Sequence, residues 1–187
     1  MLEEFAGRVY DAMLGRAVRG MRGVKPMDAQ WVHRAEKSRR ALLERYPAAA
    51  GAELREFCSA AGGFGRISGE AMFLQGHTLA RIPPELLPAL TGECSVYRCA
   101  GVIYSALVTQ PGDGARLPFL CELQGTRTQC LQELAQMQEA LERLADRLRI
   151  ERDDPRLDAL LRAHLRLCIH AARMMYEYGV QFSRFNL

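Results

Sequence analysis

Apolar residues recur at spacings of three and four over two long stretches near the end of the chain. The first stretch carries Leu134, Met137, Leu141, Leu144 and Leu148. The second carries Leu157, Leu160, Leu161, His164, Leu165, Cys168, Ala172, Met175, Gly179 and Phe182. This spacing is typical of amphipathic helices. Asp154 followed by Pro155 predicts the start of the second helix, with Asp as its N-cap. Because neither helix can bury its stripe alone, residues 126–187 are predicted to form an antiparallel helical hairpin.

The same spacing predicts four helices before residue 83. The first begins at Leu2, and Asp28 is predicted to cap a second that ends near Tyr46. A third covers 48–61 and a fourth begins at Ser68. Between these two, residues 62–69 contain four glycines. This stretch lacks the preceding strand and the spacing of a phosphate-binding loop, so it predicts a plain inter-helix loop. The inner face of the second helix is predicted to carry Trp31, Val32, Ala35, Leu42, Leu43 and Tyr46.

The segment 94–124 has two interpretations. Val96, Ala100, Ile103 and Leu107 have helical spacing, whereas 102–109 and 116–123 also fit a small β-hairpin around the turn at 111–114. Pro118 weighs against a central strand, because proline cannot donate a backbone hydrogen bond to a neighbouring strand. The helical interpretation is therefore favoured, and the β-hairpin stays as the alternative.

These patterns predict an all-α protein, a bundle of six to eight helices built on the C-terminal hairpin. A chain of 187 residues with 49% hydrophobic residues fits a single domain, 1–187. Prolines at 83, 84 and 88 suggest a subdivision into N-terminal helices (1–82), a variable middle segment (83–125) and the hairpin (126–187). No apolar run approaches the roughly 20 residues of a membrane span. The acidic opening Glu3-Glu4 differs from a secretory signal, so a cytoplasmic protein is expected.

Two stretches of the sequence echo each other. Residues 72–79 and 175–182 both read Met, aromatic, two variable residues, Gly, two variable residues and an apolar residue. Glycine costs about 1 kcal/mol relative to alanine inside a helix, so Gly76 and Gly179 predict close helix crossings. Internal duplication and chance convergence on helical spacing both account for this similarity between the two segments.

The N-terminal part of the chain carries a resemblance. Leu2-Glu3-Glu4-Phe5 with Val9-Tyr10, and the Phe73-x-x-Gly76-x-x-Leu79 pattern, resemble small uncharacterised helical bacterial proteins of unknown function. The resemblance covers about residues 1–80. It implies a helical fold and a bacterial or phage source, and it brings no activity with it.

Positive charge is concentrated near the N-terminus. The net charge of the chain is +3, and residues 1–46 hold ten Lys or Arg against six Asp or Glu. The candidate binding residues are the basic side chains of the second predicted helix: Arg34, Lys37, Arg39, Arg40 and Arg45. Such a cluster is most often a solvated helix face, but it also fits a phosphate backbone or an acidic protein. Of the 25 basic residues 23 are arginine, which fits either a coding bias or a preference for bidentate contacts.

The cysteines and histidines offer one weak metal site. His164 and Cys168 lie one helical turn apart, a spacing compatible with zinc, and Cys58, His77, Cys130 or a carboxylate would have to complete the site. The alternative is that both residues belong to the core stripe. The six cysteines contain no C-x-x-C pair and are expected to be free thiols. No catalytic residue, metal or cofactor is assigned.

The function expected from these features is a non-catalytic regulatory or adaptor protein that acts through protein–protein contacts. The alternatives are a nucleic-acid-binding protein that uses the basic helix at 28–46, and a metal- or thiol-dependent enzyme. The 134–148 seam also fits a homodimer contact, but it spans barely two heptads. A contact inside the bundle is therefore favoured.

Overall fold

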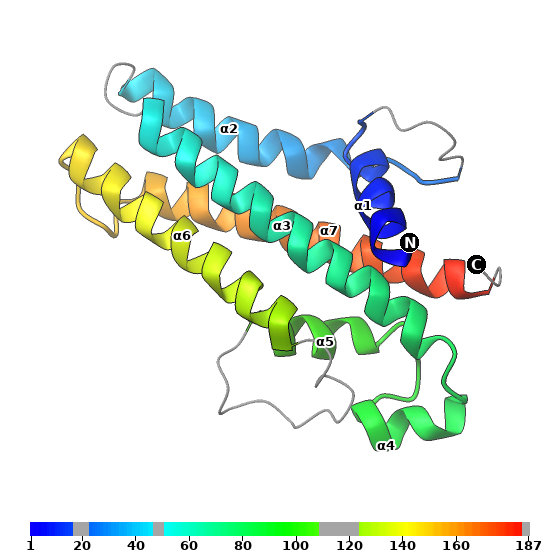
Figure 1. Ribbon diagram of the computed structural model, residues 1–187. Helices are drawn as coiled ribbons and strands as arrows, with labels where there is room; N and C mark the ends of the chain where they lie inside the picture. Colours follow the sequence, from blue (N-terminus) through cyan, green and yellow to red (C-terminus); the bar gives the residue numbers. More distant parts are fainter. Residues whose placement is uncertain (17–22, 47–50, 109–123, 185–187) are drawn as a thin grey trace.

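The computed structural model describes residues 1–16, 23–46, 51–108 and 124–184. Across these ranges the chain is helical and contains no strand, which confirms the all-α prediction. The described ranges hold seven α-helices and one turn of 3₁₀-helix, η1, at Pro84–Leu86 (Figure 1). The helices are α1 (Leu2–Met13), α2 (Ala29–Arg45), α3 (Gly51–Leu79), α4 (Leu87–Thr91), α5 (Cys99–Val108), α6 (Gln124–Leu148) and α7 (Pro155–Ser183).

Helix α3, rather than the C-terminal hairpin, is the element on which the other long helices pack. It packs most extensively against α7 and next against α6, whereas α6 and α7 touch each other at few points (Figure 1). The turn between α6 and α7 is tight: Arg149 has φ 54°, and Asp154 caps α7 by accepting a hydrogen bond from the Arg156 amide. The predicted stripes on both helices are buried or partly buried, in large part against α3. The two helices exist as predicted, but their pairing as an organising hairpin is not confirmed.

The predicted break at 62–69 is wrong, because α3 continues through it. Three of its four glycines, Gly63, Gly65 and Gly69, lie where other helices approach closely. A Cβ atom at Gly63 would lie 2.7 Å from the Glu133 carboxylate of α6, and one at Gly69 would lie 2.9 Å from the Tyr10 ring of α1. Glycine therefore serves close packing here, and burial against three neighbouring helices outweighs its low helix propensity.

Gly76 and Gly179 allow the backbones of α3 and α7 to cross in contact. A Cβ atom at Gly76 would run into the Tyr176 carbonyl of α7, and one at Gly179 would run into the Phe73 carbonyl of α3. In each of the two similar segments, 72–79 and 175–182, the aromatic residue thus lies opposite the glycine of the other segment. Phe73 and Tyr176 are both fully buried. The prediction of close helix crossings at these two glycines is confirmed.

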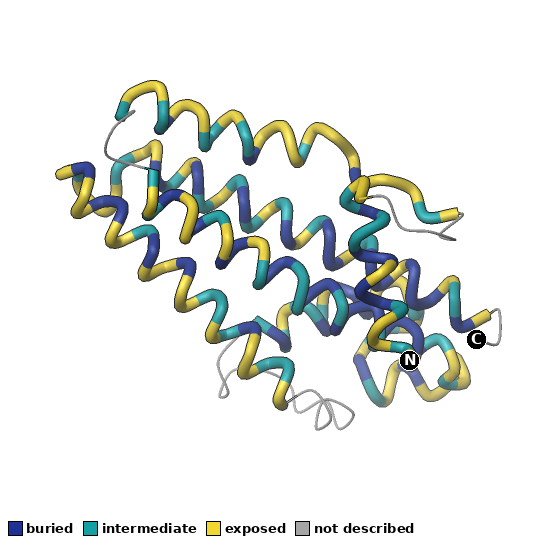
Figure 2. Tube along the Cα trace, turned by 45° about the horizontal axis from the view of Figure 1, so that its top comes forward, coloured by how far each residue is buried: buried dark blue, intermediate teal, exposed yellow. Residues whose placement is uncertain are grey.

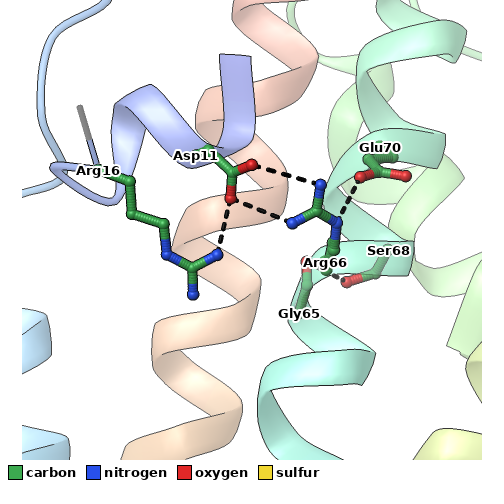
Figure 3. Close-up of polar contacts among 6 residues, drawn as sticks. All are labelled: Asp11, Arg16, Gly65, Arg66, Ser68 and Glu70. Atoms are coloured by element: carbon green, nitrogen blue, oxygen red, sulfur yellow. Dashed lines mark hydrogen bonds and ion pairs between the residues drawn. The ribbon is translucent and has the colours of Figure 1, made fainter. Parts of the chain in front are cut away.

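An ion-pair network holds α1 on the middle of α3 (Figure 3). The Arg66 guanidinium donates to Asp11 at 3.1 Å and pairs with Glu70 at 2.9 Å, while Arg16 also donates to Asp11 at 2.8 Å. The buried Ser68 hydroxyl donates a hydrogen bond to the Phe64 carbonyl within α3. Burial raises the pKa of Glu70, and the adjacent Arg66 opposes this shift. Arg66 belongs to the glycine-rich stretch 62–69, for which the sequence predicts a loop. The network therefore joins α1 to this part of α3.

The favoured helical interpretation of the middle segment is confirmed as far as residue 108. Helix α5 packs through Ile103 and Leu107 into a core cluster shared with α3 and α7. The Tyr176 hydroxyl of α7 donates to the Val96 carbonyl at 2.7 Å, just before α5. Residues 102–108 are helical and not a strand, and the rest of the alternative hairpin, 109–123, lies outside the described residues. Core contacts therefore join the three predicted subdivisions of the chain.

Helix α2 lies on the outside of the bundle. Asp28 caps it as predicted, accepting a hydrogen bond from the Gln30 amide at 3.0 Å. Of its 17 residues only Ala35 and Leu42 are fully buried, and exposed positions run along its length (Figure 2). Val32 was predicted on the inner face but is 46% exposed. The inward face of α2 is narrower than the sequence pattern suggested.

Within the described ranges, no helix is both long enough and apolar enough to cross a membrane.

Replacing either crossing glycine by alanine is expected to destabilise the protein strongly. The added methyl group meets backbone atoms of the facing helix, which cannot rotate away, so Gly76→Ala and Gly179→Ala should each cost about 2–3 kcal/mol or more. Urea unfolding followed by circular dichroism measures this loss. The matched control is Gly62→Ala in the same helix, because no atom lies within 4 Å of the Cβ position there. That variant should gain roughly 0.5–1 kcal/mol. Equal stabilities of Gly76→Ala and Gly62→Ala would contradict the crossing.

Candidate functional site

The five predicted basic residues all lie on α2, on its outer face or at the edge of that face. Arg34, Lys37, Arg40 and Arg45 are exposed, and Arg39 is partly buried. Within Ala29–Arg45 five basic residues face two acidic ones, which gives this helix a formal charge of +3, equal to that of the whole chain. The outermost helix is therefore also the site of the positive excess.

A single carboxylate, Glu36, organises part of this basic set. Arg39 binds it through two hydrogen bonds of 2.8 and 2.7 Å, and Arg40 adds a third of 3.0 Å. These hydrogen bonds lower the pKa of Glu36 to about 2. Arg34 instead stacks its guanidinium over the Trp31 ring at 5.1 Å. Arg39 and Arg40 are thus partly neutralised, whereas Lys37 and Arg45 extend into solvent.

An apolar hollow adjoins the N-terminal half of α2. Its volume is about 390 Å³, and it lies where α1 and the segment before α2 meet α2. Its apolar lining comes from Met13 of α1, Leu14 just after it, Pro26, Met27 and Val32 of α2. His33 and Glu36 of α2 form its polar side. We refer to this hollow together with Lys37 and Arg40 as the α2 surface. Sequence reasoning found its charges but missed its apolar part, because Val32 was assigned to the core.

The structure does not bring His164 and Cys168 together as metal ligands. The His164 imidazole donates from Nδ1 to the Leu160 carbonyl at 2.9 Å, and the Cys168 thiol lies 3.5 Å from the Ala61 carbonyl. Cys168 is buried in a cluster with Phe64. In the part of the chain that the structure describes, no group of three or more His, Cys, Asp or Glu residues is placed to hold a metal ion.

His164 faces Cys58 instead. Its Nε2 atom lies 4.0 Å from the Cys58 sulfur, and Phe57 packs edge-on against the imidazole. Because Nδ1 donates to a carbonyl, Nε2 of the neutral imidazole bears the lone pair and accepts from the thiol. Burial lowers the pKa of His164 and raises the pKa of Cys58, so the resting pair is neutral.

The Cys58 thiol lines a second hollow, between α2 and α3. This hollow measures about 380 Å³, and Arg39, Leu43, Gly51, Leu54 and Arg55 line it with Cys58. Arg39 therefore belongs both to the basic set of α2 and to the wall of the Cys58 hollow. The sequence had named Cys58 only as one of several partners for His164. The two residues lie 106 positions apart, and their meeting depends on the packing of α3 against α7.

Comparisons with protein-family models, with curated proteins and with solved structures gave no match. The resemblance of residues 1–80 to small helical bacterial proteins stays a prediction.

The Glu36 bridge should make stability depend on pH in the acidic range. Because the pKa of Glu36 in the folded protein is about 2, below its ordinary value of 4.5, its contribution is present above that ordinary value and is lost as the pH falls through 2. The difference in unfolding free energy between the native protein and Glu36→Gln should therefore shrink from about pH 6 to about pH 2. Urea unfolding at several pH values measures it. A difference that stays constant would show that the bridge does not form.

Proposed function

We propose that this protein is a non-catalytic regulatory or adaptor protein that binds an acidic segment of another protein through the α2 surface. The observation that carries the proposal is the juxtaposition on α2 of an apolar hollow and exposed cations. Apolar anchors in pockets with a charged rim are the arrangement that gives protein interfaces their affinity and their specificity.

The charge of α2 sets the chemistry of the partner. Lys37 and Arg40 are exposed beside the hollow, and Arg34 lies on the same outer face. A partner segment with carboxylates next to an apolar side chain complements these features. The apolar side chain would fill the hollow between Met13, Met27 and Val32, and the carboxylates would face Lys37 and Arg40. An amphipathic acidic helix meets both requirements in one element.

Nucleic acid is the second candidate, supported by the exposed basic residues along α2. Two observations favour protein. Glu36 binds the Arg39 guanidinium with two hydrogen bonds and Arg40 Nε with one, and this partial neutralisation weakens the attraction of α2 for a continuous phosphate backbone. The hollow beside them exposes mostly apolar atoms, which a phosphate backbone does not fill.

The α6 seam offers no comparable surface. Met137, Leu144 and Leu148 are buried within the chain, in a cluster with Phe57 of α3. This packing supports the view of the seam as a contact inside the bundle.

A peptide-display selection on the full chain tests the proposal. We expect the enriched peptides to combine Asp or Glu with a large apolar residue. The double variant Lys37→Glu/Arg40→Glu should weaken their binding about tenfold, because it replaces two attractive charge contacts with repulsive ones. Val32→Asp should weaken it as well, because it places a charge in the apolar hollow. Fluorescence anisotropy of a labelled enriched peptide measures both effects.

The control is the double variant Arg143→Glu/Arg147→Glu on α6, which lies across α3 from α2 (Figure 1). Both arginines are more than half exposed, and the change in charge is the same. Binding should be unaffected. Equal losses in both double variants, or enriched peptides without acidic residues, would contradict the proposal. Binding of random-sequence oligonucleotides that Lys37→Glu/Arg40→Glu abolishes, with no peptide enriched, would establish the nucleic-acid alternative instead.

A further inference from the structure

The Cys58 hollow contains the elements of a thiol modification site. A half-buried thiol lies at its wall, and a histidine nitrogen with an available lone pair lies 4.0 Å from the sulfur. Arg39, Arg55, Leu43 and Leu54 line the hollow with the thiol. None of these features is required for binding at the α2 surface. The inference made from them goes beyond the proposed function and does not depend on it.

Each wall of the hollow restricts the reagent that fits. The volume of about 380 Å³ admits a small molecule. The exposed Arg55 guanidinium favours carboxylates, which arginine binds with paired hydrogen bonds, whereas Glu36 already holds the Arg39 guanidinium. The leucine side chains accept an apolar stem. A carboxylate-bearing molecule of low molecular weight meets all three conditions.

The His164 imidazole is fixed in the orientation that the chemistry needs. The Leu160 carbonyl accepts the proton of Nδ1, and Phe57 packs against the ring at a centroid distance of 5.0 Å. The Nε2 lone pair is thereby directed at Cys58. Because the resting pair is neutral, the imidazole accepts the thiol proton as the sulfur attacks, and this transfer gives the sulfur the thiolate character that attack on a disulfide requires.

We propose that Cys58 forms a mixed disulfide with anionic disulfides of low molecular weight. The Cys58 sulfur attacks one sulfur of the reagent disulfide, and the S–H proton passes to His164 Nε2. The new Cys58–S bond forms as the reagent S–S bond breaks, and the departing thiolate takes the proton back from the imidazolium. The Cys58 sulfur is oxidised and the departing sulfur is reduced, so the exchange balances without another reactant.

The exposed Cys94 provides a comparison within the same chain. It lies outside the hollow, between α4 and α5, so its rate reports ordinary solvent-exposed exchange. The full chain is incubated with oxidised glutathione, an anionic disulfide, or with cystamine, a cationic one. Peptide mass spectrometry then follows the adducts at both cysteines. We expect Cys58 to prefer oxidised glutathione over cystamine by about threefold or more relative to Cys94, because the exposed Arg55 attracts the anionic reagent.

Two variants test the roles of the residues. Arg55 is exposed, so Arg55→Gln should fold normally and reduce the preference of Cys58 for oxidised glutathione, with Cys94 unchanged. His164→Gln should slow modification of Cys58 by both reagents and leave the ratio of their rates intact. The same anion preference at Cys58 and Cys94 would overturn the proposal. So would an unchanged preference in Arg55→Gln, or adducts at Cys94 with none at Cys58.

Discussion

The direct contact between the α3 and α7 backbones is the constraint on which the rest of the bundle depends. It requires glycine on both helices, because Gly76 and Gly179 each face a carbonyl of the other helix. With the two longest helices fixed at this crossing, α6 packs along α3 near the far end of the bundle. Core clusters then form on either side of the crossing, one with α5 and one with α1. The chain thus obtains its core from helices distant in sequence rather than from the sequential pair α6 and α7.

This arrangement places the polar features on the outer layer. Helix α2 packs mainly on α7 and keeps most of its length exposed, which allows it to carry the positive excess of the chain. The same packing positions Arg39 over the junction where Cys58 of α3 meets His164 of α7. The proposed binding surface and the Cys58 hollow therefore share one helix, and the bridge between Glu36 and Arg39 separates them.

Local pattern was sufficient to predict much of the fold. Periodic apolar residues identified α2, α6 and α7, and the caps at Asp28 and Asp154 are present because a carboxylate satisfies an otherwise unpaired amide at a helix start. The failures have one physical cause. The stretch 62–69 looks like a loop when judged by the helix propensity of its glycines, yet Glu133 fills the space beside Gly63 and Tyr10 fills the space beside Gly65 and Gly69. Which helix lies beside these glycines depends on the tertiary packing and is not contained in the local sequence pattern. The basic set on α2 was visible in the sequence, whereas the pair of Cys58 and His164 became visible only with the crossing of α3 and α7.

Native-state amide hydrogen exchange tests the central role of this crossing most directly, since the slowest amides report the most stable part of a fold. The structure predicts the slowest exchange in residues 72–79 of α3 and 175–182 of α7, with α2 exchanging much faster. Strong protection confined to α6 and the first half of α7, with α3 opening easily, would contradict it. That result would make the C-terminal hairpin the organising element.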